Sequence, residues 1–595
     1  MPDQTGLKRF LPPIGSPAYH VLLSVVAITI LGPLGGISAA FMNFSIGFFV
    51  GGQVLAGILG SVVTLPYGPE GKHGANYMQS MAASVAGMCA MAVLLQAIVW
   101  LGLPMPPAWK LVLFLTCIGM FGVGVGMLYT PVLVDRMQLT YPSGYAVANI
   151  LRALTDPALL RRSIAKLGGG MLTGYAVGFA ALKSAAVGAI GVSASTVGAG
   201  FIVGARIAIP ALVVALIGLG IKPHLVEIGW LAAGEPYRKI GFIISLGTIL
   251  GAAGLDITLI LIEAVKRYRQ QSGAPVAAAP DWKRVNVVRL LLWIVAWGAG
   301  VVIVGSQVLH QPVFFLVVAL GLCFLFVLVN GISQGISDWN PISSAFVMAV
   351  FIMAALGLKD PGVGLMCSAI LLISCSVGCD MQQDRSTGWR LGTNRVNQFR
   401  YQVIGILCGA VLCVVLARLF MSAYPILQVD QFANPHVEGA QQWQSAMTYK
   451  FVGAIRGITN AQPHVLKALW LGIGIGLTIM AVRKLIKRTA AYRNFVANSP
   501  AGPATDFILD AFILTSPYAS SFGGFVELPT VLWWAGGGIF GTLFTMWAAR
   551  RKPAPGEAEL PADMSTMSLV GGGLIAGDSL AALSIGIYGL LTTVL

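Results

Sequence analysis

Charged side chains are scarce in this chain. Asp, Glu, Lys and Arg make up 10% of its 595 residues, whereas about a quarter of an ordinary soluble domain is charged. Hydrophobic residues make up 56%, and the mean hydropathy is +0.81. This composition excludes a soluble globular protein. The apolar runs are about 20 residues long and do not alternate with polar residues, which indicates membrane-spanning helices rather than the strands of a barrel.

Several patterns that carry chemistry are absent. The chain has no Gly-x-x-x-x-Gly-Lys-Ser/Thr phosphate loop, no His-Glu-x-x-His metal motif and no Gly-x-Ser-x-Gly nucleophile elbow. The eight cysteines all lie in apolar runs, which argues against a disulfide framework. Cys375 and Cys379, one turn apart, are read as packing residues in preference to metal ligands. We therefore expect neither an enzyme, nor a cofactor, nor a bound metal.

The net charge of +15 is explained by loops beside membrane spans. Most Lys and Arg residues occur there, as the positive-inside rule predicts, so the expected partner is a lipid bilayer and not nucleic acid. Lys8 and Arg9 precede the first span, which predicts a multi-pass protein of the cell (inner) membrane with a cytoplasmic N-terminus. Counting spans puts the basic Asp135–Lys166 segment, read as a loop, on the same side, but places the basic loop Lys266–Arg289 on the opposite side.

A broken helix would correct this count. The apolar run Ser193–Ile221 is long for one crossing, and it is interpreted as a short re-entrant helix followed by a full span. With this element, the fold expected is an all-α integral membrane bundle of about 14–16 transmembrane helices. The alternative, a half-span element elsewhere within 193–233, stays open at this point.

Two internal repeats are expected, residues 1–310 and 311–595. Phe41–Gly60 can be aligned without gaps on Asp338–Gly357, with identical residues at five positions. Internal repeats with interrupted helices are how many transporters build a binding site at the membrane midplane. The sequence leaves open whether the repeats are parallel or inverted, and whether the chain forms a homo-oligomer.

Polar residues inside apolar runs are the candidate substrate-binding groups, because charge in lipid is costly. Arg206 could bind a substrate carboxylate, or form a structural ion pair. Glu527, in a Gly/Pro-broken segment, could pair with an amine or carry a proton. Asn340 is expected to cap a helix that starts at Pro341, and Tyr141 lies in a turn that either lines a gate or only connects two elements. Further candidates are Asp256, Asp510 and Asp578 as proton carriers and Lys183 as a snorkelling or binding cation.

The most polar stretch is Asp380–Arg400. It holds two carboxylates and four arginines between two apolar runs. The arginines are spaced by five residues and would not share one helix face, so a folded cytoplasmic loop is predicted in preference to a basic helix. A structural or gating role is expected first, and a substrate role second.

The same stretch resembles the signature of the oligopeptide transporter (OPT) family. The matching residues are Gln383, Asp384, Arg385, Gly388, Arg395 and Gln402, although Ser386 and Asn394 depart from the family's Lys and Pro. Three further segments are similar to family elements: Tyr141–Tyr145, Gly200–Arg206 and Leu574–Leu580. Together these matches span about residues 140 to 580.

The resemblance implies a secondary active, proton-coupled importer. Its substrate would be an oligopeptide or a peptide-like molecule; the alternative is a metal-chelate transporter of the same family. The alternative from a different functional class is a passive channel or a lipid-handling protein. Arg206 and Glu527 are the residues expected to hold the two charged ends of the substrate, with Asn340 and Tyr141 as further binding residues.

Overall fold

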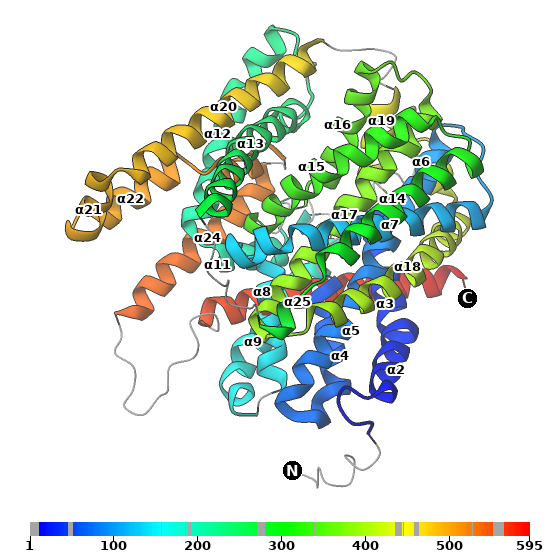
Figure 1. Ribbon diagram of the computed structural model, residues 1–595, viewed down its shortest axis with the longest axis horizontal. Helices are drawn as coiled ribbons and strands as arrows, with labels where there is room; N and C mark the ends of the chain where they lie inside the picture. Colours follow the sequence, from blue (N-terminus) through cyan, green and yellow to red (C-terminus); the bar gives the residue numbers. More distant parts are fainter. Residues whose placement is uncertain are drawn as a thin grey trace.

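The computed structural model describes residues 11–45, 52–155, 157–184, 186–187, 190, 192–270, 280–337, 340–434, 443, 445–456, 463–525, 528–550 and 565–594. Within these ranges the chain is helical and contains no β-strand. Ten of the described helices are long and apolar enough to cross a membrane. The all-α, polytopic membrane fold is therefore confirmed (Figure 1).

The helices of the first half are α2 (Pro17–Val26), α3 (Gly32–Ser45), α4 (Gly52–Thr64), α5 (Gly71–Ala90), α6 (Ala92–Trp100), α7 (Ala108–Thr130), α8 (Pro142–Thr155), α9 (Pro157–Lys183), α11 (Ala194–Val203), α12 (Ala205–Glu227), α13 (Arg238–Gln270) and α14 (Val287–Ile303). Those of the second half are α15 (Val313–Ser337), α16 (Ile342–Ala355), α17 (Pro361–Leu391), α18 (Arg395–Ala423), α19 (Ala446–Arg456), α20 (Pro463–Arg488), α21 (Ala490–Asn498), α22 (Gly502–Ile508), α23 (Pro517–Phe525), α24 (Leu528–Ala549) and α25 (Thr566–Val594).

Helix α17 lies at the centre of the bundle. It packs against α5, α7, α8, α15 and α16, and 89% of its most apolar window is buried (Figure 1). By contrast, 22% of the corresponding window of α20 is buried. The outer helix α14 exposes an apolar face that includes Val288 and Val295. A buried central helix that carries polar residues, surrounded by helices with exposed apolar faces, is the arrangement that a lipid environment requires.

The two predicted repeats pack against each other along their length. Helix α5 lies against α18, α7 against α17, α9 against α25 and α13 against α20. The halves 1–310 and 311–595 are therefore interleaved within one bundle. That they are internal repeats stays a prediction.

The predicted break in the run 193–221 is present. Helix α11 ends at Gly204, whose φ of 75° is a conformation that residues with a Cβ rarely adopt, and α12 follows at once. With ten residues, α11 is about 15 Å long and too short to cross a bilayer. The short helix α23 and the long helix α24 form a second pair of this kind, and both pack against α12.

One end of the molecule brings together the N-terminal segment and basic residues from two distant segments, Lys283 and Arg395. Trp282, from the loop that span counting misplaces, lines the same cavity as Ile14 near the N-terminus and Asn394 between α17 and α18. Lys283 from this loop lies 3.7 Å from Asp135, which follows α7. The loop that span counting misplaces therefore lies beside the N-terminal segment, and the side of the membrane that each loop faces stays a prediction. The expected loop at Asp135–Lys166 is wrong, because α8 and the first part of α9 occupy most of it and the apolar face of α8 is buried.

Candidate functional site

The expected loop at Asp380–Arg400 is also wrong. Residues up to Leu391 continue α17, and Arg395 opens α18, so the four arginines are divided between two helices. Gly392, with φ of 73°, ends α17, and the Asn394 side chain caps α18 by accepting a hydrogen bond of 3.0 Å from the Asn397 amide. The polar residues of Asp380–Arg400 are therefore not a water-exposed loop, because most of their side chains form hydrogen bonds inside the bundle.

We call six interior side chains the polar core. They come from α5, α17 and α18, which meet at the centre of the bundle. They are Asn76, Gln79, Asp384, Arg385, Gln398 and Gln402, each at most 1% exposed.

Asp384 is held in the polar core by neutral donors. Gln79 Nε2 donates to Asp384 Oδ1 at 2.6 Å, and Gln402 Nε2 donates to Asp384 Oδ2 at 2.9 Å. Among the described residues, no Lys, Arg or His nitrogen lies within 4 Å of this carboxylate. The negative charge is therefore stabilised by amide dipoles and by more distant cations.

Arg385 is completely buried beside it. Its Nη2 donates to Gln402 Oε1 at 2.9 Å, so that Gln402 bridges the guanidinium to the Asp384 carboxylate. Arg385 Nε and Nη1 have no hydrogen-bond partner in the part of the chain that the structure describes. Leaving a donor of a buried charged group without a partner costs more than about 1–3 kcal/mol. We therefore expect a ligand or a water molecule to bind at this edge of the guanidinium.

Gln398 joins the polar core to α5. Its Nε2 lies 2.6 Å from Asn76 Oδ1 and 3.2 Å from Ser80 Oγ, and it also donates to the backbone oxygen of Asp384 at 3.0 Å. A Cβ at Gly388 would lie 2.5 Å from Gln398 Oε1. The signature glycine therefore leaves room for this carboxamide.

Asn340 and Tyr141 lie on the other side of α17. Asn340 accepts a hydrogen bond of 3.1 Å from Asn330 and donates to the backbone oxygen of Cys375 at 3.2 Å. It does not cap a helix, because α16 begins at Ile342 with no capping side chain. Asn340 instead ties α15 to α17.

Tyr141 precedes α8 with a positive φ of 46°. Its amide donates to the backbone oxygen of Gly335 at 2.8 Å, and its buried hydroxyl donates to that of Gly331 at 3.1 Å. Gly144 one turn later contacts α17, where a Cβ would lie 2.7 Å from the backbone oxygen of Gln383. The Tyr-Pro-Ser-Gly element thus docks α8 onto α15 and α17, close to the polar core.

Arg395 anchors the end of α18. Both its Nη atoms bond to the Asp135 carboxylate, with Nη1 at 2.8 Å, and its side chain is 4% exposed. Lys283 approaches the same carboxylate. Bidentate geometry makes this a strong contact between α7 and α18.

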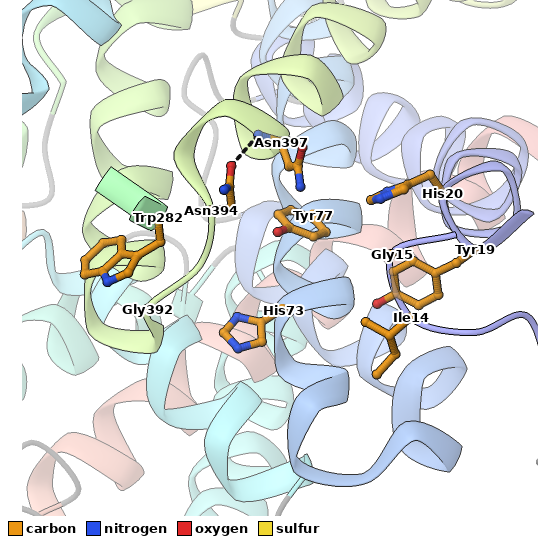
Figure 2. Close-up of a pocket in the computed structure, with 10 residues that line it drawn as sticks. All are labelled: Ile14, Gly15, Tyr19, His20, His73, Tyr77, Trp282, Gly392, Asn394 and Asn397. Atoms are coloured by element: carbon orange, nitrogen blue, oxygen red, sulfur yellow. Dashed lines mark hydrogen bonds between the residues drawn. The ribbon is translucent and has the colours of Figure 1, made fainter. Parts of the chain in front are cut away.

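A cavity of about 210 Å³ opens beside this anchor, between α2, α5 and the corner that joins α17 to α18 (Figure 2). Tyr77 and His73 on α5 form its inner wall, facing His20 on α2 and Asn397 on α18 (Figure 2). The Tyr77 ring stacks on that of Tyr401 at 5.1 Å. The cavity is smaller than pockets that enclose a drug-sized ligand, and it suits water or part of a substrate.

Arg206 lies in a separate group of charges, which we call the Arg206 cluster. Its Nη1 lies 2.8 Å from Asp506 and 3.0 Å from Asp510. Asp510 also pairs with Arg483 at 2.9 Å and with Lys487 at 2.6 Å. The side chain of Arg206 is 48% exposed, so it forms a peripheral link between α12 and the α20–α22 flank seen on the left of Figure 1.

The pKa of Asp506 is lowered within this cluster. Burial by itself raises the pKa of Asp506, but hydrogen bonds from Tyr492, Lys487 and Arg206 outweigh it and lower the pKa to about 2. The hydroxyl of Tyr492 donates at 2.7 Å. Burial and this charged neighbour together raise the pKa of Tyr492 to about 12. The carboxylate therefore stays charged across the physiological range.

Asp578 lies at the start of the short helix α11. Its Oδ2 accepts hydrogen bonds from the Ser195 amide at 3.0 Å, from Ser195 Oγ at 2.5 Å and from Ser193 Oγ at 3.2 Å. The positive end of α11 also favours a negative charge there. Asp578, within the family-like segment Leu574–Leu580, thus links α25 to the start of α11.

The remaining candidates carry less information. Glu527 and the side chain of Asp256 lie outside the described residues. Lys183, at the end of α9, has its ammonium 5.8 Å from the centre of the Tyr588 ring. Within the described ranges, no group of three His, Cys, Asp or Glu side chains could hold a metal ion.

Residues 17–588 match the family described as OPT oligopeptide transporter protein. The chain belongs to this family. The resemblance drawn from the Asp384 signature is confirmed, and the protein is a multi-pass membrane member of the OPT family. The family is one of membrane transporters and not of enzymes.

Among curated proteins the chain is similar to plant members of the family. "Probable metal-nicotianamine transporter YSL8" of Oryza sativa subsp. japonica is 25% identical over 193 residues, which are 32% of this chain and 26% of the relative. YSL12 of the same plant, with the same description, is 22% identical over 420 residues, 60% of this chain and 57% of the relative. YSL6 of Arabidopsis thaliana, likewise described, is 28% identical over 115 residues, 19% and 16% respectively. The chain thus matches between about a sixth and a little over half of the length of these relatives.

The OPT signature and the polar core overlap only in part. Asp384, Arg385 and Gln402 are signature residues, but Asn76, Gln79 and Gln398 were not candidates in the sequence analysis. Asn76 and Gln79 lie on α5, three residues apart in an apolar run. Residues at this spacing lie on the same face of a helix, so the spacing could have identified them as candidates. Their partners, Asp384 on α17 and Gln398 on α18, are more than 300 positions away, and only the fold brings them together.

Proposed function

We propose that this OPT protein is a secondary active importer, driven by the proton gradient, for small substrates that carry amino and carboxylate groups. Metal chelates of amino-carboxylate ligands are the first class, and short peptides are the second. The observation that supports this proposal is the polar core, where a buried carboxylate and a buried, partly unpartnered guanidinium lie side by side in an apolar bundle. Ionisable residues inside membrane proteins commonly mark substrate or ion pathways.

The two substrate classes share the chemistry that such a site would recognise. A carboxylate matches the fork of a guanidinium, and an amine or a bound proton matches a carboxylate. The relatives' descriptions favour the chelate class for this chain, whereas the family's description favours peptides. Arg206 becomes a less suitable clamp than Arg385, because two carboxylates already neutralise it.

The basic end of the molecule is proposed to face the cytoplasm. Arg395, Lys283 and Arg284 gather there beside the N-terminal segment, and cytoplasmic loops carry an excess of such residues. Trp282 next to Lys283, with 4.9 Å between the ammonium and the ring centre, is suited to a membrane interface.

Uptake into proteoliposomes tests the proposed function. The purified protein should accumulate radiolabelled nickel(II)–nicotianamine complex under an imposed proton gradient, and unlabelled complex should compete whereas free nickel should not. Competition by short peptides instead would favour the peptide class. Uptake that ignores the gradient and both competitors would contradict secondary active transport.

A binding measurement separates the same classes without transport. A ligand that binds only the folded state raises the unfolding temperature in a saturable way. Saturable stabilisation by the nickel complex, and none by di- and tripeptides, is the expected result in detergent micelles. Free nicotianamine serves as the control for the chelator alone.

A further inference from the structure

The two charges of the polar core are linked indirectly. Gln402 donates to Asp384 and accepts from Arg385, so the pair is neutral as a whole but has no direct ion pair. Loss of either charge would leave the other one buried and uncompensated, which is strongly unfavourable. Any change in the charge of Asp384 must therefore be matched at Arg385.

We propose that Asp384 binds the coupling proton and that the unpartnered edge of Arg385 then holds a carboxylate of the substrate. This inference rests on the proposed function and assigns its coupling site. A proton adds to Asp384 and neutralises it, and the anionic group restores neutrality by pairing with Arg385 Nε and Nη1. Proton and substrate therefore enter the core together, and release of one weakens the binding of the other.

Gln79 allows Asp384 to exist in both protonation states. In the charged state Gln79 Nε2 donates to Oδ1, while Gln79 Oε1 has no partner among the described residues. Rotation of the Gln79 amide by half a turn presents Oε1 as an acceptor for the proton of neutral Asp384. The bonds of Gln402 to Asp384 Oδ2 and to Arg385 need not change.

The cavity beside α5 supplies a route for the proton. Tyr77 lines the cavity (Figure 2), and it also interacts electrostatically with Arg385 of the polar core. The charged and titratable groups that face Asp384 and Arg385 from neighbouring helices are Tyr77 on α5 and Arg395 on α18. Arg395 is already neutralised by Asp135, so Asp384 is left to balance Arg385.

The other buried carboxylates are less suited to this role. Asp510 is already paired with three cations, Arg206, Arg483 and Lys487. Asp578 lies at the positive end of α11 and accepts from a backbone amide, which cannot reverse its direction. Among the described residues, the groups that bond to the Asp384 carboxylate are all neutral and rotatable, namely the amides of Gln79 and Gln402 and the hydroxyl of Ser80.

Proton uptake on binding tests the proposal directly. Nickel(II)–nicotianamine is added to the purified full-length protein in weakly buffered detergent solution, and protons taken up per complex bound are counted. At a pH at which Asp384 is charged before binding, the wild-type protein should take up about one proton per complex bound. Asp384→Asn, which resembles the neutral acid, should bind the complex and take up none. Asp578→Asn, a matched change of a second buried acid, should behave as the wild type.

Transport by the same variants gives the second measurement. Asp384→Asn should exchange labelled for unlabelled complex across the membrane but should not accumulate it, so the inside-to-outside ratio falls to one. Arg385→Lys, which keeps the charge but loses the fork, should bind the complex about tenfold more weakly or worse.

The outcomes are distinguishable. If the wild-type protein neither binds nor transports the complex, the proposed function fails for this substrate. If the wild type accumulates it under a gradient and Asp384→Asn does so equally, or takes up the same proton, the assignment to Asp384 is overturned. If Asp384→Asn does not fold, the wild-type count decides, because binding without proton uptake at every pH tested overturns the proposal.

Discussion

Replacing Gln402 with leucine tests how the polar core is held together. The carboxamide makes two hydrogen bonds at 2.9 Å, one to the Asp384 carboxylate and one from the Arg385 guanidinium. Leucine has a similar volume and no polar atoms. The variant therefore removes the bridge between two buried charges and leaves the apolar packing nearly unchanged.

The expected cost is large for a single substitution. A hydrogen bond to a charged group contributes about 1.5–3 kcal/mol, so the loss of two lowers the free energy of unfolding by about 3–6 kcal/mol. Gln334→Leu is the matched control, because Gln334 is also buried but donates to the neutral side chain of Gln383 at 2.8 Å. Neutral hydrogen bonds between membrane helices average about 0.6 kcal/mol, so the control should lose about 1 kcal/mol or less.

Unfolding by sodium dodecyl sulfate in mixed micelles, followed by tryptophan fluorescence, measures both variants. Gln402→Leu should unfold at a clearly lower detergent fraction than Gln334→Leu. Equal destabilisation of the two variants would show that the charges of the core do not depend on Gln402, and the reasoning about an indirectly bridged pair would fail.

Three further substitutions test other parts of the fold. Asp506→Asn should lower the free energy of unfolding by roughly 1 kcal/mol near neutral pH, after allowance for solvent screening. The pKa of Asp506 in the folded protein, about 2, lies below the ordinary value, so this stabilisation is present above about pH 4 and is lost as the pH falls toward 2. The thermal unfolding temperatures of wild type and variant should therefore converge at that pH. Gly204→Ala should lower the free energy of unfolding by about 1–3 kcal/mol, because its φ of 75° and ψ of 173° lie in a region that is essentially restricted to glycine. Gly220→Ala, in α12 with open space around it, should not, as thermal melts can show. Asp135→Asn should weaken the anchor of Arg395 by about 1.5–3 kcal/mol, seen as faster proteolysis at the α17–α18 corner; unchanged cleavage would contradict the role of the ion pair.

Much of the architecture could be predicted from local chemistry. The break at Gly204 follows from a glycine within an apolar run too long for one crossing. The membrane class follows from the scarcity of charge. These features depend on residues close together in the chain, where length and composition are enough.

The polar core could be predicted only in part. The polar sequence at Asp384 and Arg385 suggested exposure to water, yet both side chains are buried because α5 and α18 supply amide partners. Sequence alone does not show which distant helix faces a charged residue. For the same reason Arg206 was a plausible substrate clamp until Asp506 and Asp510 were found beside it.

The most direct test is a structure of the protein with substrate bound at acidic pH, determined by cryo-electron microscopy with the nickel(II)–nicotianamine complex. We expect a substrate carboxylate within hydrogen-bond distance of Arg385 Nε and Nη1, next to Asp384 in the polar core. Substrate bound against Arg206 instead, with Arg385 unchanged and still unpartnered, would contradict this expectation.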